Sequence, residues 1–216
     1  MAHLSNLQIA VDYLKAGKAV VFPTDTAYGL AVDATSAKAI KRMFKIKKRR
    51  PTKPVHIVVS DLRMAKRYAR FTPEAEKLFK KLLPGPLTLI LDLRDNPSQP
   101  PLSLRGGVQA LKLLSAGTGT IGIRMPKNKI ALELAKKLGR PITATSANIS
   151  DGPTAYSVSQ IKWQYRNEKL KPDFTLDSGL LAKVQPSTMV RLTGNKAQII
   201  RRGPITKTQI LNAIKF

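Results

Sequence analysis

The chain has 216 residues, 43% of them hydrophobic, which is typical of a globular protein with a core rather than of a disordered one. It has no Cys and only two His residues, which excludes disulfides, thiolate metal sites, a Cys nucleophile and a site built from several His. Lys and Arg outnumber Asp and Glu by 38 to 13, and the net charge of +25 favours polyanionic ligands such as nucleotides or nucleic acid. No apolar run approaches the roughly 20 residues of a membrane-spanning helix, and the N-terminus lacks the apolar run of a signal peptide. We therefore expect a cytoplasmic protein without a membrane partner.

The first elements are a helix, a strand and a second helix. Ser5, with a Gln three residues later, has the pattern of a capping box and predicts a helix that ends at Gly17. An apolar strand is predicted at 19–22, and the proline after it opens a loop over 23–30. Ser36 is the expected N-cap of the second helix, which runs into a basic segment.

The rest of the chain continues to alternate strands and helices. Ser60 and Thr72 are the expected N-caps of two helices, and the Pro-, Gly- and Ser-rich segment 94–119 is predicted to be an exposed, mobile loop. A helix that ends at Gly139, one near 157–165 and one capped at Thr206 follow. Further strands are expected at 55–59, 87–91, 120–124, 142–145, 188–192 and 197–200, the last two as a hairpin. This order predicts an α/β (α+β) domain with one sheet flanked by helices.

Acidic residues are missing from the segments in which polar motifs gather. No Asp or Glu occurs over 34–60 or over 96–132, and the first of these segments holds nine Lys or Arg. A glycosidase-type carboxylate pair and a carboxylate metal cage are therefore disfavoured, and we predict no metal-ligating residues. Hydroxyls, amides and cations at the ends of strands are instead the groups that hold phosphates and carboxylates.

Four such clusters stand out, and each also has a simpler interpretation. The hydroxyls of the 23–30 loop could hold a small polar ligand or form an ordinary turn. The cations of 48–53 could converge on an oligophosphate or form a solvated helix end. Arg124, at the end of an apolar strand, could bind a carboxylate or form a structural ion pair. The hydroxyls of 143–148 could bind phosphate or cap a turn.

Taken in order, the motifs resemble the YrdC/TsaC family of L-threonylcarbamoyladenylate synthases. The matching segments are FPTDTAYGL at 22–30, K-x-R-P at 48–51, PGPLT at 84–88, TIGIRMP at 120–126, TSAN at 145–148, PST at 186–188 and IIRRG at 199–203. The resemblance as a whole spans about residues 7–204. The resemblance implies a single YrdC-like domain over 1–216, with a twisted mixed sheet and a basic concave groove. The chain resembles the short form without a further C-terminal domain.

This family condenses L-threonine, bicarbonate or CO2, and ATP into threonylcarbamoyl-AMP and pyrophosphate. A separate transferase uses the product to form N6-threonylcarbamoyladenosine at position 37 of tRNAs that read ANN codons. The resemblance therefore implies a nucleotidyltransferase that uses Mg2+ with ATP, the ion being held mainly by the phosphates.

The resemblance also implies roles for particular residues. Those expected at L-threonine, with Arg124 at its carboxylate, are Thr26, Arg124, Ala144 and Ser187. Those expected at ATP are Lys48, Arg50, Lys53, Thr120, Ser146, Asn148, Thr154 and Arg201, of which Lys48 and Arg50 are also the expected catalytic residues. Tyr28 is expected in the pocket wall.

Four features depart from the family pattern or lack an obvious partner. Asp25 stands where Glu is usual, and the loop after Arg50 is one residue shorter than in some members. His56 lies two residues before the position of a His found in some long forms, so it receives no role. The acid nearest to Arg124 in the sequence is Glu133, so no local partner for this cation is evident.

Two alternatives share this fold. A non-catalytic protein that binds double-stranded RNA or tRNA would explain the net charge of +25. Paralogues without synthase activity are altered at the K-x-R and S-x-N positions, so the presence of Lys48, Arg50, Ser146 and Asn148 favours the enzyme. The carbamoyl-transfer domain of hydrogenase maturation proteins accompanies zinc-finger regions, which a chain without Cys does not have. RNA binding remains compatible with the enzyme.

Overall fold

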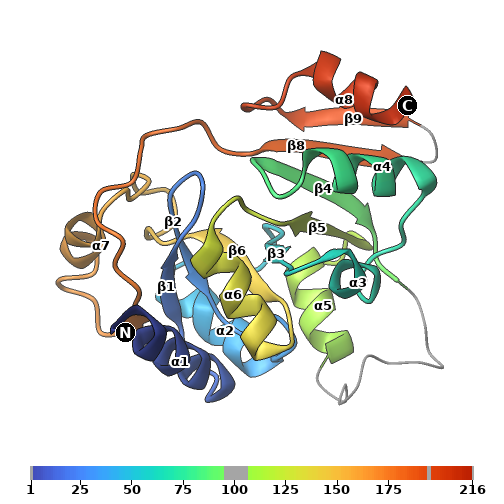
Figure 1. Ribbon diagram of the computed structural model, residues 1–216. Helices are drawn as coiled ribbons and strands as arrows, with labels where there is room; N and C mark the ends of the chain where they lie inside the picture. The colour runs from blue at the N-terminus through green and yellow to red at the C-terminus, as the bar shows by residue number, and fades with distance from the viewer. Residues whose placement is uncertain (1, 95–106, 194–195, 216) are drawn as a thin grey trace.

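The computed structural model describes residues 2–94, 107–193 and 196–215. Its strands are β1 (Val20–Pro23), β2 (Tyr28–Ala31), β3 (His56–Val58), β4 (Leu87–Asp92), β5 (Thr120–Arg124), β6 (Ile142–Ser146), β7 (Phe174–Thr175), β8 (Thr188–Thr193) and β9 (Lys196–Arg201). They form one sheet in the order β7-β1-β2-β6-β3-β5-β4-β8-β9 (Figure 1). The pairs β1–β7, β3–β5 and β4–β8 are parallel and the other five are antiparallel, so the mixed sheet is confirmed.

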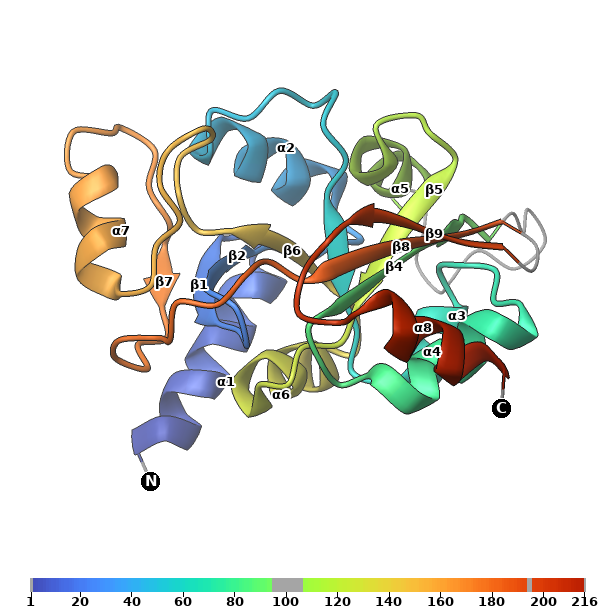
Figure 2. The same ribbon diagram turned by 90° about the horizontal axis from the view of Figure 1, so that it is seen from above.

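Helices cover both faces of this sheet. They are α1 (Ala2–Lys15), α2 (Ala37–Ile46), α3 (Leu62–Lys66), α4 (Pro73–Leu82), α5 (Gly107–Ser115), α6 (Lys129–Leu138), α7 (Val158–Gln164) and α8 (Lys207–Lys215). Helix α1 packs with α6 on one side of the β1–β2 half, and α2 packs with α5 on the other (Figure 2). Helices α4 and α8 pack together beside β4. Within the described ranges, no helix is long and apolar enough to span a bilayer.

Several helix ends form as the sequence predicts, because local side chains satisfy the free backbone groups there. The Ser36 and Thr72 hydroxyls accept hydrogen bonds from the first turns of α2 and α4. Gly139 ends α6 with a φ of 70°, a left-handed conformation that glycine adopts without strain. Thr206 and Gln209 exchange hydrogen bonds at the start of α8.

Two segments predicted as loops contain regular structure. Helix α5 lies inside the predicted 94–119 loop, and the rest of that loop over 95–106 falls outside the described residues. Ala110 and Leu114 are four residues apart and both are fully buried, so one face of α5 packs on the core. The loop predicted at 23–30 spans only residues 24–27, because Tyr28 starts β2 and forms a hairpin with β1.

Two predicted helix caps were wrong, and one strand was missed. Helix α1 begins at Ala2, so Ser5 is not its N-cap; Ala and Leu before that serine favour helix. Asp61 rather than Ser60 caps α3, because its carboxylate accepts the Met64 N–H at 2.7 Å. The strand β7 was not predicted. That residues 1–216 form a single domain stays a prediction.

Candidate active site

A cavity of about 290 Å³ opens among the β1–β2 turn, the ends of β5 and β6, and the segment that enters β8. Eight of the residues that the sequence predicts at the site line it: Thr26, Tyr28, Arg124, Ala144, Ser146, Thr154, Ser187 and Arg201. These residues come from segments that are far apart in the sequence. The sheet order brings them together, because β2, β6, β3 and β5 are consecutive neighbours.

The predicted cations of the K-x-R segment do not line the cavity. Lys48 is exposed and its Nζ lies 2.8 Å from Glu168, Arg50 is exposed, and Lys53 pairs with Asp151 at 3.3 Å. Lys48 also has a positive φ of 50°, which marks the turn where the chain leaves α2.

The alternate members of the same basic run point inward instead. Lys47 is buried, and Arg49 lines the cavity. The Arg49 Nη2 donates to the carbonyl of Pro54 at 2.9 Å, and its Nε is buried without a hydrogen-bond partner in the described part of the chain. The spacing of the motif predicted Lys48 and Arg50 at the site, each one residue later in the chain than the cations that point inward.

Two other predicted ATP contacts also lie outside the cavity lining. Thr120 begins β5, whereas Arg124 ends it, so the two are about 13 Å apart at the usual rise per residue. Asn148 is buried in the loop after β6, where its amide group donates to the carbonyls of Ile149 and Gly152. Its Oδ1 is buried and unpartnered among the described residues.

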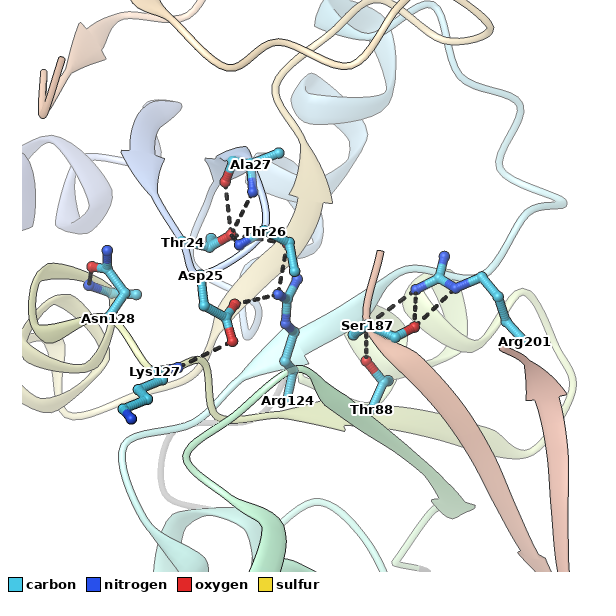
Figure 3. Close-up of polar contacts among 11 residues, drawn as sticks. Thr24, Asp25, Thr26, Ala27, Thr88, Arg124, Lys127, Asn128, Ser187 and Arg201 are labelled. Atoms are coloured by element: carbon cyan, nitrogen blue, oxygen red, sulfur yellow. Dashed lines mark hydrogen bonds and ion pairs between the residues drawn. The ribbon is translucent and has the colours of Figure 1, made fainter. Parts of the chain in front are cut away.

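Arg124 has an acidic partner that the sequence did not indicate. Its Nη2 donates to Asp25 Oδ1 at 2.5 Å and to Thr26 Oγ1 at 2.8 Å (Figure 3). The other oxygen of Asp25 accepts the Lys127 N–H at 3.2 Å. The side chains of Arg124 and Asp25 are only 12% and 10% exposed, so this ion pair is buried. The sequence left open a structural ion pair with an acid distant in the chain, and the structure shows one, because the β1–β2 turn folds over the end of β5.

The turn that carries Asp25 and Thr26 is held by Thr24. Its Oγ1 accepts the N–H groups of Thr26 and Ala27, each at 3.2 Å, and donates to the Ala27 carbonyl at 2.7 Å (Figure 3). A hydroxyl that bonds to its own turn restricts the backbone there. Thr24 therefore helps to fix Thr26 beside Arg124.

Ser187 is held from two sides at the opposite wall. Its Oγ lies 2.8 Å from Thr88 Oγ1, and Arg201 donates to both the carbonyl and the hydroxyl of Ser187 (Figure 3). The arginine comes from β9, at the edge of the sheet, and the threonine comes from β4, two strands further in, so both strands hold Ser187 at the cavity.

His56 also lines the cavity, and sequence reasoning gave it no role. Burial, together with the charges of Arg201, Arg124 and Arg49, lowers the pKa of His56 to about 4. The imidazole is therefore neutral near pH 7. Gly122 lies directly against this ring, since a Cβ at that position would overlap it.

The electrostatics of the cavity favour an anion. Burial lowers the pKa of Arg124, Arg201 and Arg49, and Asp25 and Asp151 oppose this at Arg124 and Arg49 respectively. The charge of Arg124 lowers the pKa of Arg201 further, so these two guanidinium groups are near enough to repel. Arginine nevertheless stays charged. Among the described residues, no Asp or Glu lines the cavity, so a bound anion would relieve this repulsion.

Sequence reasoning missed Arg49 and His56, and also Tyr156 and Val184, which line the cavity. The sequence did contain a signal for Arg49 and His56. Arg49 belongs to the same basic run as Arg50, and His56 starts the strand that follows it. Tyr156 and Val184 lie in irregular segments, where no periodicity shows which side chains point inward.

Comparison with known proteins finds a family model and several relatives that agree with one another. A family model described as "Telomere recombination" (Sua5/YciO/YrdC) matches residues 12–203. A threonylcarbamoyl-AMP synthase of Pyrococcus abyssi is 32% identical, over 96% of this chain and 57% of the relative. A putative threonylcarbamoyl-AMP synthase of Methanocaldococcus jannaschii is 34% identical, over 88% of this chain and 81% of the relative.

The fold is shared with a solved structure as well. The crystal structure of P. abyssi Sua5 complexed with L-threonine aligns with a TM-score of 0.82 and 32% identity, over 96% of this chain and 57% of that one. The chain thus spans little more than half the length of the P. abyssi relative. Since the family model covers most of its residues, the chain belongs to the Sua5/YciO/YrdC family.

Proposed function

We propose that this chain is a threonylcarbamoyl-AMP synthase. The observation that carries the proposal is the convergence of Arg49, Arg124 and Arg201 on a cavity whose described lining has hydroxyls but no carboxylate. Relatives that bear this name, and a related structure with L-threonine bound, support it.

The proposed chemistry needs positioning and charge neutralisation more than a side-chain nucleophile. The amine of L-threonine combines with CO2, derived from bicarbonate, to form a carbamate. A carbamate oxygen then attacks the α-phosphorus of ATP, and pyrophosphate leaves. The carbamate, which forms as the amine loses a proton, threonylcarbamoyl-AMP and pyrophosphate are all anionic, which suits a cavity of guanidinium groups.

The threonine end is proposed to lie at Arg124. Its Nη2 is held by Asp25 and Thr26, whereas its Nε is buried without a described partner. An unsatisfied buried donor is costly, and a ligand carboxylate would satisfy it. Thr26, Ser187 and the backbone of Ala144 complete this end of the cavity.

The ATP end is proposed to use Arg49 in place of Arg50, together with Ser146, Thr154 and Arg201. Arg49 lines the cavity, whereas Arg50 is exposed. If the K-x-R motif is Lys47-x-Arg49, the loop that follows gains one residue, which removes the shortening noted above. Tyr28 forms part of the cavity wall, and its hydroxyl holds it in place by donating to the Gly179 carbonyl at 2.8 Å.

We propose that Mg2+ enters with ATP and is held mainly by the phosphates. The described residues contain no cluster of three or more His, Asp or Glu that would hold a metal, and both oxygens of Asp25 are already bonded. This donor set fits an ion that keeps phosphate and water ligands. The ion would supply charge neutralisation at the phosphates.

The test is pyrophosphate release from ATP, with L-threonine, bicarbonate and Mg2+ omitted in turn. We expect release only when all are present, and threonylcarbamoyl-AMP as the product. Release that is independent of threonine would contradict the proposal. The proposed consumer of the product is a tRNA threonylcarbamoyl transferase in the cytoplasm.

RNA or tRNA binding is a second proposal, and one surface feature favours it. Trp163 on α7 is 62% exposed, and the Arg166 guanidinium lies 4.2 Å from its ring centroid. Exposed aromatic rings beside cations stack on nucleobases. RNA affinity should fall steeply with salt. Trp163→Ala should weaken RNA binding without changing pyrophosphate release, and equal RNA affinity of the variant and the wild type would exclude this surface.

A further inference from the structure

Lys47 is a buried ammonium group behind the cavity wall. It is the C-cap of α2, directly after Ile46, and it is 1% exposed. Its Nζ donates to the carbonyls of Ser146 and Asn148, the latter at 2.6 Å. Its own carbonyl accepts the Ser150 N–H at 2.8 Å. Lys47 therefore takes part in three hydrogen bonds, two donated and one accepted, that join the end of α2 to the end of β6 and the loop after it.

This loop carries a part of the proposed ATP end. Ser146 lines the cavity, and Asn148 folds back on the loop through its amide group. Gln164 of α7 supports the same loop by accepting the Ile149 N–H at 3.1 Å. Lys47 is the charged group in this set of contacts, and it reaches the loop from the side of α2.

Burial of a lysine at this position is energetically unfavourable. In the described part of the chain, no carboxylate pairs with Lys47, and only carbonyl oxygens accept from it. Burial and, to a smaller extent, the charge of Arg49 together lower its pKa to about 7. A Met would fill similar space without burying a charge, so an unpaired ammonium here needs a reason beyond packing.

The groups that face Lys47 suggest that reason. Arg49 is the charged group that acts on it, and the loop after β6 presents carbonyls. The cavity that Ser146 lines would hold the phosphates of ATP under the proposed function. An anion there would favour the charged form of Lys47, and the charged form donates more strongly to both carbonyls.

We propose that Lys47 is a positioning residue for this reaction: it places Ser146 and its loop for ATP, and it takes up a proton when a phosphate-bearing ligand enters the cavity. The inference rests on the proposed function for the identity of the ligand. Because the pKa of Lys47 is lowered to about 7 in the free protein, ATP binding at pH 8 should be accompanied by the uptake of up to one proton.

The variants are Lys47→Met, which removes the amine, and Lys47→Arg, which keeps the charge but cannot lose a proton near neutral pH. Lys45→Met is the matched control, because Lys45 is exposed on the same helix. Circular dichroism melts establish that each variant folds.

Two measurements separate positioning from mere stability. Titration calorimetry with ATP at pH 8, in buffers of different ionisation enthalpy, counts the protons taken up. We expect uptake in the wild type and in Lys45→Met, and none in Lys47→Arg. In kinetics, kcat/KM for ATP should fall above about pH 7 in the wild type, and Lys47→Arg should remove that fall. Lys47→Met should raise the KM for ATP tenfold or more and that for threonine much less.

Proton uptake that persists in Lys47→Arg would overturn the inference, as would a Lys47→Met enzyme with the KM values of Lys45→Met. If Lys47→Met does not fold, Lys47→Arg still decides through proton uptake. The calorimetric count uses ATP binding alone, so it remains valid if pyrophosphate release proves independent of threonine and the proposed function fails.

Discussion

The clearest test of the site compares Arg49→Gln with Arg50→Gln. The two residues are adjacent in one basic run, but Arg49 lines the cavity and Arg50 is exposed. Loss of a charge-assisted contact to a phosphate costs about 1.5–3 kcal/mol, or about 10- to 100-fold in affinity. We therefore expect Arg49→Gln to raise the KM for ATP by about that factor.

Arg50→Gln should have a much smaller effect. At physiological salt the Debye length is about 8 Å, so an exposed charge outside the cavity is largely screened from its contents. We expect a change in KM for ATP of less than about threefold. The assay is pyrophosphate release at saturating threonine, with melting temperatures as a control for folding. A larger loss in Arg50→Gln than in Arg49→Gln would refute the assignment of Arg49 to the site.

Three further predictions concern the buried groups around the cavity. Asp25→Asn leaves Arg124 buried without its charge partner, which costs about 3–5 kcal/mol, so the melting temperature should fall by several degrees; Asp25→Glu, which keeps the charge, should lose less. Gly122→Ala should destabilise the protein by about 1–3 kcal/mol and displace His56, visible as a changed imidazole resonance in NMR. The unfolded chain binds more protons than the folded one between the lowered pKa of Lys47, about 7, and its ordinary value of 10.5, so this residue makes the unfolding free energy rise with pH in that window. The pH dependence of denaturant unfolding should therefore be flatter in Lys47→Met, and an unchanged slope would contradict the buried placement.

Much of the fold could be predicted because its signals are local. The apolar run at 120–124 became β5 with the same bounds, and the caps at Ser36 and Thr72 formed as expected. Helix α5 was missed because its apolar residues follow a long Pro- and Gly-rich stretch, and packing on the core decides its conformation. The two-residue strand β7 forms by pairing with β1, and so short a segment carries no periodicity of its own.

The basic run at 47–50 shows why motif spacing alone does not identify site residues. Four successive cations offer two K-x-R registers, and the sequence does not distinguish them. The structure does, because α2 ends at Ile46 and the chain turns at Lys48 with a positive φ. That turn directs Lys47 and Arg49 inward and leaves Lys48 and Arg50 in solvent. The inward register depends on where the helix stops, which is a property of its packing.

The partner of Arg124 could not be found from the sequence for a related reason. Asp25 lies 99 residues away, and the two meet only because β2, β6, β3 and β5 stand side by side in the sheet. This contact changes how a ligand carboxylate would be bound. The ion pair holds the guanidinium through Nη2 before any ligand arrives, and Nε is left as a buried donor without a described partner. Because the side chain is already ordered, binding would not have to immobilise it, and the affinity for a carboxylate gains accordingly. A structural ion pair and a ligand contact are therefore compatible roles for one arginine.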